Sequence, residues 1–272
     1  LSIGNPDYVT CIRSALKPFQ ASAAIAEGAT DNAGFISEEI ALMCASHNGE
    51  KIHVETAIAM ANKLGFNLTH YECGSHPPHD KGSREEARKS NTIFTPLHNN
   101  CSGKHSGMLS LAKKLCSDPA GYTQIDHPVQ QTIFKKLSKL TGHNNFSTGI
   151  DGCSAPTPFL SLQSIARLFQ ALGSNKYPEL EKAYSSMARH PYLIGGKNRF
   201  DTEFSSALKG RGVCKAGGEA VRGITIKTNK YGLTGIAIKV LDGNQRAIET
   251  ASMAILNHLS VLKKCEKERL LQ

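Results

Sequence analysis

A run of reactive side chains lies near the middle of the chain, from His98 to Met108. Its sequence, HNNCSGKHSGM, contains one thiol, two imidazoles, an amine, two amides and two hydroxyls, with two glycines that let the backbone bend. Each buried polar group costs free energy unless it finds a partner, so a folding core has little use for such a run. The run leads directly into an apolar helical stretch over 108–115, which a merely solvated loop would not explain. It therefore indicates a functional site.

Cysteine and lysine side chains in and near this run have the chemistry of metal ligands. Cys101 and Lys104 are three residues apart, and Cys153 lies in the segment DGCSAP at 151–156. Two thiolates and a deprotonated amine could hold zinc, leaving a fourth position for water or substrate. Lysine is a rare ligand because its amine must first lose a proton. From spacing alone, two buried structural cysteines are the favoured interpretation. The histidines are individually interpreted as hydrogen-bonding scaffold: His47, His98 and His105.

A second candidate site combines serine with lysine. Ser14 and Lys17 form a Ser-x-x-Lys pattern at a predicted helix start, where one helical turn places the hydroxyl and the amine on the same face. A neutral lysine there can take the serine proton, and the helix N-terminus favours the negative charge that develops. The isolated pattern is weak, because an N-cap serine beside a solvated lysine has the same spacing.

Two further patterns strengthen the serine-lysine interpretation. Residues 46–48, Ser-His-Asn, fit Ser-x-Asn, and residues 215–217, Lys-Ala-Gly, fit Lys-x-Gly. The order Ser-x-x-Lys, Ser-x-Asn, Lys-x-Gly is that of the serine β-lactamases and penicillin-binding proteins. The first two patterns lie closer together than in those enzymes, so a simple β-lactamase is not expected.

The elements that must position these residues are helical over most of the chain. The polar segment 73–90, rich in histidine, proline and charge, is expected to be a mobile loop. Gly65, Gly142 and Gly173 each follow the end of a predicted helix. Helices are predicted at 14–27, 36–47, 51–64, 105–116, 127–140, 157–172 and 178–188.

The C-terminal part of the chain changes character. Residues 223–228 and 234–240 alternate apolar and polar side chains on either side of a turn at 229–232, which is the signature of a β-hairpin. A final amphipathic helix over about 246–264 is expected to pack on that sheet.

We therefore predict an α+β fold in a single domain, residues 1–272. Its helical part covers about 36–210, and its sheet-forming part covers about 211–272. The predicted strands are too few for a full sheet, so partner strands are expected ahead of Leu1.

Composition argues against several classes of protein. The chain has 40% hydrophobic and 20% charged residues, which is typical of a globular protein, and no stretch resembles a membrane span or a secretory signal. The net charge of +9 comes from basic residues spread along the chain, and Trp is absent, so neither a nucleic-acid nor a membrane partner is expected. Eight dispersed cysteines favour a reducing compartment, and we expect a cytoplasmic location.

Residues 98–105, HNNCSGKH, closely resemble the signature of the L-asparaginase II family, the rhizobial-type or type III asparaginases. The resemblance implies a serine β-lactamase-like fold, in which helices flank an antiparallel sheet beside a helical subdomain. It also implies hydrolysis of L-asparagine to L-aspartate and ammonia, and we expect a homodimer. Further segments similar to the family follow in order along nearly the whole chain: 13–18 (RSALKP), 44–47 (CASH), 151–156 (DGCSAP), 199–202 (RFDT), 215–219 (KAGGE) and 241–243 (LDG).

The resemblance also assigns roles to individual residues. The expected nucleophile is Ser14, which attacks the side-chain amide carbon while Lys17, or a relay through Ser46 and Lys215, accepts its proton. A zinc cofactor is expected to orient the substrate or tune the pocket. The two catalytic Ser-Lys pairs are Ser14 with Lys17 and Ser46 with Lys215. The zinc ligands are Cys101, Lys104 and Cys153. The expected substrate contacts are Arg13, His47, Lys104, His105 and Asp151.

Other functions fit parts of the same pattern. A glutaminase or a β-lactam-recognising acyl-transfer enzyme would use the same serines and lysines. A non-catalytic zinc-binding relative would keep the fold and the cysteines, but the presence of both Ser-Lys pairs argues against it.

Overall fold

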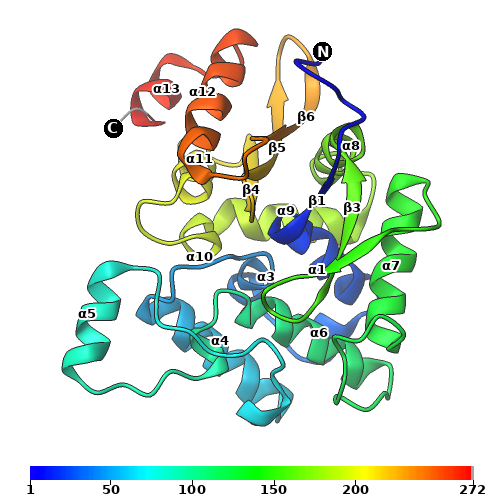
Figure 1. The fold of residues 1–272 in the computed structure, drawn as a ribbon, viewed down its shortest axis with the longest axis vertical. Helices are drawn as coiled ribbons and strands as arrows, with labels where there is room; N and C mark the ends of the chain where they lie inside the picture. The colour runs from blue at the N-terminus through cyan, green and yellow to red at the C-terminus, as the bar shows by residue number, and fades with distance from the viewer. Residues whose placement is uncertain (271–272) are drawn as a thin grey trace.

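The computed structural model describes residues 1–270 and combines helices with two small antiparallel sheets (Figure 1). This arrangement confirms the predicted α+β class. The first sheet has the order β1-β3-β2, with β1 (Val9–Cys11), β2 (Thr148–Ile150) and β3 (Pro156–Ser161). The second has the order β4-β5-β6, with β4 (Gly212–Gly217), β5 (Val221–Thr228) and β6 (Gly232–Lys239).

Helices form the rest of the framework. Short single turns precede or connect several of them, and the turn at Arg13–Leu16 leads directly into the first helix. The helices are α1 (Lys17–Ala26), α2 (Ala29–Asn32), α3 (Ser37–Met43), α4 (Lys51–Leu64), α5 (Lys81–Lys89), α6 (Ser102–Lys114), α7 (Pro128–Thr141), α8 (Leu162–Leu172), α9 (Pro178–Arg189), α10 (Pro191–Ile194), α11 (Phe200–Leu208), α12 (Ile248–His258) and α13 (Lys264–Leu270).

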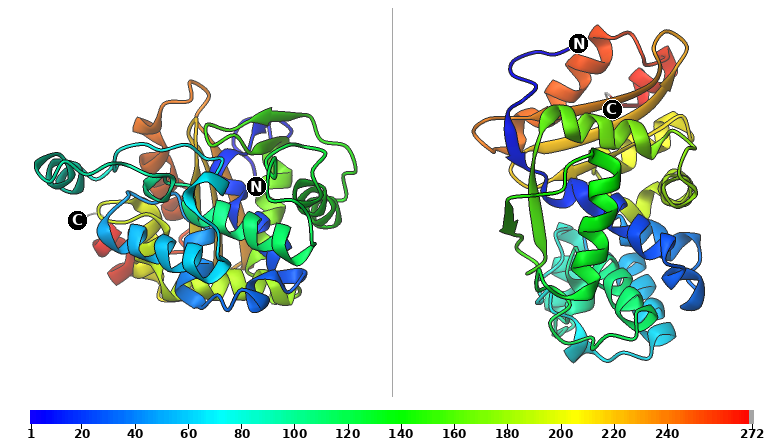
Figure 2. Two further views of the ribbon diagram at one scale, coloured as in Figure 1. Left: turned by 90° about the horizontal axis from the view of Figure 1, so that it is seen from below. Right: turned by 90° about the vertical axis from the view of Figure 1, so that its right-hand side faces the viewer.

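The β4-β5-β6 sheet lies between α8 on one face and α11 with α12 on the other (Figure 2). Side chains alternate along a strand, so β5 can be buried on both faces. Ile224 faces a cluster that includes Phe204 and Leu256, whereas Val221 joins the larger core that contains Phe169 of α8. The sheet therefore separates two hydrophobic clusters.

Helix α1 lies at the centre of the helical body, in contact with α6, α7 and α9 (Figure 1). The turn that precedes α1 packs against the end of β4. This packing is close: a Cβ on Gly217 would lie 2.7 Å from the carbonyl oxygen of Ile12. The start of α1 and the end of β4, far apart in sequence, are thus held side by side.

The hairpin prediction is confirmed, because β5 and β6 pair antiparallel around a turn at 229–231. The helix predicted over 157–172 is wrong in its first part, where 156–161 forms β3. Two prolines in this segment disfavour a helix, and β3 pairs with β1 and β2. Strands β2 and β3 thus lie within the part expected to be helical.

The segment 73–90, expected to be a loop throughout, contains helix α5. Asp80 caps it, because its Oδ2 accepts a hydrogen bond of 2.7 Å from the Ser83 N–H. None of the residues of α5 is buried, so the sequence has no apolar stripe to indicate a helix.

Three other helix boundaries differ from the prediction. The helix expected from 36 to 47 ends at Met43, and α6 begins at Ser102 rather than at 105, so Lys104 belongs to its first turn. The final helix, expected over about 246–264, ends at His258 as α12, and a separate helix, α13, begins at Lys264. Among the residues that the structure describes, no helix combines the length and the apolar character needed to cross a membrane.

Candidate active site

A cavity of about 590 Å³ opens where the start of α1, the end of β4, the segment after α3 and the approach to α6 meet. Its volume is in the range of small-molecule sites. Six of the predicted site residues line it, which brings catalytic and metal-binding candidates to one place: Arg13, Ser14, Ser46, Cys101, Asp151 and Cys153.

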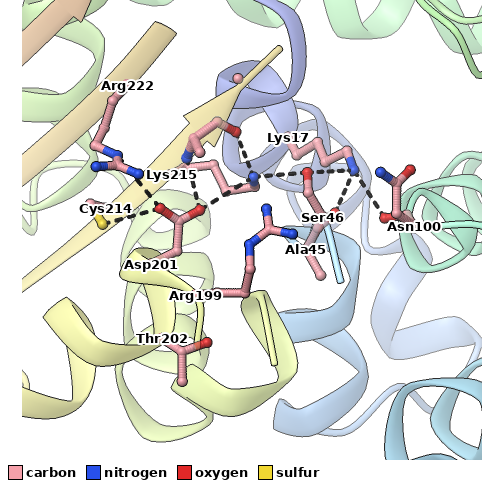
Figure 3. A network of polar contacts seen from close by, with 12 residues as sticks. Lys17, Ala45, Ser46, Asn100, Arg199, Asp201, Thr202, Cys214, Lys215 and Arg222 are labelled. Carbon is pink, nitrogen blue, oxygen red and sulfur yellow. Dashed lines mark hydrogen bonds and ion pairs between the residues drawn. The ribbon is translucent and has the colours of Figure 1, made fainter. Parts of the chain in front are cut away.

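The Ser46 hydroxyl lies between two lysine amines at the edge of this cavity (Figure 3). Lys17 Nζ donates to Ser46 Oγ at 3.0 Å, and Lys215 Nζ donates to the same oxygen at 2.8 Å. Both lysines are almost completely buried, with 1% and 0% of their surface exposed. A hydroxyl shared by two buried amines is suited to proton transfer.

Ser46 follows α3 in an extended segment, and its backbone N–H donates to the carbonyl of Ile194 at 3.0 Å. Lys17 comes from the first turn of α1 and also donates to the carbonyls of Ala45, at 2.5 Å, and Asn100, at 3.2 Å. Together with the Ser46 hydroxyl, the two carbonyls give Lys17 three hydrogen-bond acceptors. A protonated lysine amine has three N–H donors and can satisfy all of them.

Ser14 lines the cavity, but its expected pair with Lys17 is not hydrogen-bonded in the described part of the chain, where Lys17 donates to Ser46 instead. The residue before it, Arg13, has φ of +51°, a conformation that costs free energy for a residue with a side chain. Ser14 therefore lines the cavity directly after a residue in a strained conformation.

Asp201 is a site residue whose role was not anticipated from the sequence, although it lies in the RFDT segment. It is 3% exposed, lies 3.6 Å from Lys215 Nζ through Oδ2, and accepts the Ala216 N–H at 2.8 Å. Burial alone would raise the pKa of Asp201, but the charges of Lys215 and Arg222 hold it below its usual value. Asp201 is therefore ionised at neutral pH.

Lys215 has a pKa lowered to about 8, in the first place because burial disfavours the charged ammonium. Asp201 opposes this shift, while the positive charges of Lys17 and Arg199 reinforce it. An amine with such a pKa is partly neutral near physiological pH and can accept a proton.

The metal-ligand candidates also converge. Lys104 Nζ donates to Cys153 Sγ at 2.7 Å, and all three candidate ligands are buried. A hydrogen bond from Cys153 holds the pKa of the Cys101 thiol well below its ordinary value against the effect of burial, with help from the lysine charges. Burial alone would lower the pKa of Lys104, but the Cys153 and Cys101 sulfurs hold it above its ordinary value.

This donor set fits zinc chemically, because zinc takes thiolate and nitrogen ligands. Within residues 1–270, no group of three or more His, Cys, Asp or Glu side chains could hold a metal ion. A metal at this position would therefore need the lysine amine together with the two cysteines, and Lys104 would have to lose its proton.

Asp151 is already paired in the structure. Arg13 Nε donates to Asp151 Oδ1 at 2.9 Å, and the other end of the guanidinium pairs with Glu219. Although burial would raise the pKa of Asp151, the charges of Lys104 and Arg13 hold it below its usual value.

His47 and His105 are completely buried and do not belong to the cavity lining. His47 Nδ1 accepts the Gly49 N–H at 3.1 Å, and its Nε2 lies 2.9 Å from the Ser102 hydroxyl. These contacts are those of scaffold, and a direct contact of either histidine with substrate stays a prediction.

Several lining residues carry no motif that sequence reasoning could use. His76 and His79 come from the segment expected to be a loop, and they place two imidazoles at the cavity. Arg199 and Arg222 add two guanidinium groups. Only Arg199 had a signal in the sequence, as part of the RFDT segment.

A comparison with protein families identifies the family of the chain. The family model described as L-asparaginase II matches residues 1–272. The chain belongs to the L-asparaginase II family. It is therefore an amidohydrolase whose substrate is a small molecule, L-asparagine, and the resemblance of the central signature to this family is confirmed. A search of curated proteins finds no match to the chain.

Proposed function

We propose that this amidohydrolase works through an acyl-enzyme on Ser14, with Ser46 and Lys215 as its proton relay. The observation that carries the proposal is the Ser46 hydroxyl, held 2.8 Å from an amine whose pKa is lowered to about 8. Ser14 lines the same cavity. Its hydroxyl makes no hydrogen bond within residues 1–270, so the relay requires that it turn toward Ser46 when the substrate binds.

The proton and bond changes balance along this relay. Neutral Lys215 takes the Ser46 proton while Ser46 takes the proton of Ser14, whose oxygen bonds to the amide carbon of the substrate. The carbon–nitrogen bond then breaks, and the nitrogen leaves as ammonia with the proton returned from Lys215. Water hydrolyses the resulting ester by the same route, which releases L-aspartate and restores Ser14.

Lys17 has a different role in this scheme. Its three hydrogen bonds, to Ser46, to the Ala45 carbonyl and to the Asn100 carbonyl, fit an ammonium ion. A fixed positive charge beside the relay stabilises the oxyanion that develops on a serine. Lys17 thus serves as an electrostatic partner rather than the base.

The proposal is tested by comparing Ser14→Ala with Ser46→Ala. Both variants should lose ammonia release from L-asparagine by at least about a thousandfold, because one lacks the nucleophile and the other the relay. Circular dichroism checks that both remain folded. Mass spectrometry of parent enzyme quenched with a slow substrate analogue should place the acyl group on the peptide that contains Ser14. An acyl group on Ser46 would reverse the two roles.

Zinc at Cys101, Lys104 and Cys153 is the second part of the proposal. Bound there, the metal would act as a modest Lewis acid at the cavity wall. Replacing Cys153 with Ser should lower the zinc content of the purified protein and weaken substrate binding, which raises KM more than it lowers kcat. The matched control is Cys116→Ser, a change at an exposed cysteine. Equal zinc in Cys153→Ser and parent, by elemental analysis, would remove the metal from the proposal.

Three finer expectations from the family resemblance are also proposals: a serine β-lactamase-like fold, a homodimer and a cytoplasmic location. The α+β arrangement with α8 packed on an antiparallel sheet is compatible with the first. Assays of ammonia release from L-asparagine and L-glutamine, and of hydrolysis of a chromogenic β-lactam, separate this activity from its alternatives.

A further inference from the structure

Arg199 differs from the other two arginines at the cavity, because it forms no ion pair with a carboxylate within residues 1–270. Arg13 pairs with Asp151 and Glu219. Arg222 lies 3.8 Å from a carboxylate oxygen of Asp201 and 4.0 Å from one of Glu249. For Arg199, no carboxylate oxygen within the described residues lies within 4.0 Å of the guanidinium. A partly buried guanidinium without a counter-ion is poised to receive one.

The side chain of Arg199 is held in place by neutral contacts. Its Nη1 donates to Asn48 Oδ1 at 3.0 Å, and Asn48 is fixed in turn because its Nδ2 donates to the Lys197 carbonyl at 2.9 Å. The backbone opposite is a glycine, and a Cβ on Gly195 would lie only 2.7 Å from Arg199 Cβ. This geometry pre-organises the guanidinium but leaves most of its donors unused.

The guanidinium points toward the catalytic relay. In Figure 3, it lies beside the side chains of Lys215 and Ser46. Its positive charge contributes to the lowered pKa of Lys215, which agrees with this proximity. The cluster therefore places the amine of Lys17 and the guanidinium of Arg199 beside Lys215, with Asp201 as the carboxylate that lies 3.6 Å from Lys215 Nζ. An anionic group of the ligand would supply the counter-ion that the Arg199 guanidinium lacks among the described residues.

We propose that Arg199 binds the α-carboxylate of the amino-acid substrate. The inference rests on the proposed function, in which the side-chain amide of L-asparagine meets Ser14. In asparagine the α-carboxylate is separated from the amide carbon by only two carbon atoms, so both groups fit within one small site. A planar guanidinium can hold a carboxylate by two parallel hydrogen bonds, which a lysine cannot reproduce. Arg199 would thereby select free amino acids over amides that lack this group.

The test compares two substrates in Arg199→Gln and Arg199→Lys. L-asparagine carries the α-carboxylate, and β-alaninamide is the same molecule without it. For L-asparagine, Arg199→Gln should lower kcat/KM by about 10- to 100-fold, and Arg199→Lys should recover only part of this loss. For β-alaninamide, the change should stay within about threefold, because no carboxylate contact is lost. The matched control is Arg167→Gln, an exposed arginine on α8, which should leave both values unchanged.

Equal losses on both substrates would overturn the assignment, since Arg199 would then act on the chemistry or on the fold. An unchanged kcat/KM for L-asparagine would also overturn it. A binding measurement separates this inference from the proposed mechanism. By calorimetry on the Ser14→Ala background, Arg199→Gln should weaken L-aspartate binding about 10- to 100-fold and leave the weak binding of β-alanine unaltered. That result supports the carboxylate site even where Ser14 proves not to be the nucleophile, and unaltered L-aspartate binding contradicts it.

Discussion

A single buried carboxylate, Asp201, governs the charge of the lysine that we assign as the base. Its oxygen lies 3.6 Å from Lys215 Nζ, and it raises the pKa of an amine that burial lowers to about 8. Without Asp201, the ammonium form of Lys215 would lose its stabilising partner and the amine would be neutral at lower pH.

Replacing Asp201 with Asn should therefore move the rising limb of kcat/KM with pH to the acid side of its position in the parent enzyme. The parent limb should lie near pH 8, because Lys215 must be neutral to accept a proton. The free energy of unfolding, measured in denaturant, should also fall by about 3 kcal/mol, because the buried Lys215 and Arg222 lose a charge partner.

Glu249→Gln is the control for this experiment, because it removes an exposed carboxylate at the same cavity. It should leave the rising limb of kcat/KM with pH and the free energy of unfolding close to the parent values. An unshifted limb in Asp201→Asn would show that the group titrating in the profile is not Lys215.

At this scale, sequence reasoning selected several side chains that line the cavity but not all of their contacts. Ser46 and Lys215 were predicted as a pair, and they are hydrogen-bonded. Lys17 was expected to serve Ser14 one turn away, because helical spacing was the only geometry available. The structure places Lys17 against Ser46, since the segment after α3 passes the buried end of α1. Asp201 could not be paired with Lys215 from local patterns, because α11 and β4 meet only in the tertiary fold.

Among the elements, the contact between α3 and α6 sets the position of the metal-ligand candidates. Helix α6 begins directly after Cys101 and carries Lys104 in its first turn. A Cβ on Gly103 would lie 2.2 Å from the backbone carbonyl oxygen of Leu42 in α3, so any larger residue must push the two helices apart.

Gly103→Ala should destabilise the protein by about 1–3 kcal/mol, because backbone must move to admit the methyl group. Zinc content should fall with it, since Cys101 and Lys104 move with the start of α6. Denaturant unfolding and elemental analysis measure the two effects.

Gly107→Ala, one turn further along α6, is the matched control. A Cβ there would meet the flexible end of the Met43 side chain, at 2.5 Å from its Cε, and that side chain can rotate away. The gain in helix propensity offsets much of the cost, so stability should change by less than about 1 kcal/mol. Equal losses in the two variants would contradict the proposed role of the α3–α6 contact.

The elements that the sequence predicted well are those with a local signature. The β5–β6 hairpin has an alternating pattern and a turn, and most of the helices have an apolar stripe. Strand β3 was assigned to a helix because its partner β1 lies far away in sequence, with Val9 opposite Ser161, and its nearby partner β2 is only three residues long. Helix α5 has no buried face, so periodicity could not show it.

For the whole molecule, buried histidines tie stability to pH. His47 and His53 are buried, and burial is the main cause that holds the pKa of each below its ordinary value near 6.5. Below pH 6.5 the unfolded chain binds protons at these positions that the folded chain does not bind. The free energy of unfolding should therefore fall as the pH decreases below 6.5, by up to about 1.4 kcal/mol per pH unit for each histidine.

Denaturant unfolding at pH 7.5, 6.5 and 5.5 measures this slope. His53 Nε2 lies 3.1 Å from the Tyr192 carbonyl oxygen, and His53→Gln keeps a hydrogen-bond donor for it. The variant should lose the contribution of one histidine to the change of unfolding free energy with pH. The exposed His258→Gln should leave the slope unaltered. An equal slope in His53→Gln and parent would show that His53 does not contribute.

The Ser46 cluster also has a consequence for how the enzyme becomes active during folding. Ser46 is 29 residues from Lys17 and 169 residues from Lys215, so the three side chains meet only after the long loop between Ser46 and Lys215 has closed. Closing such loops costs chain entropy before any contact is gained, and long-range contacts of this kind form slowly. The helical signal in circular dichroism can return early on refolding, because it comes from segments that fold locally. Catalytic competence then emerges last, and ammonia release reports the completed topology rather than the secondary structure.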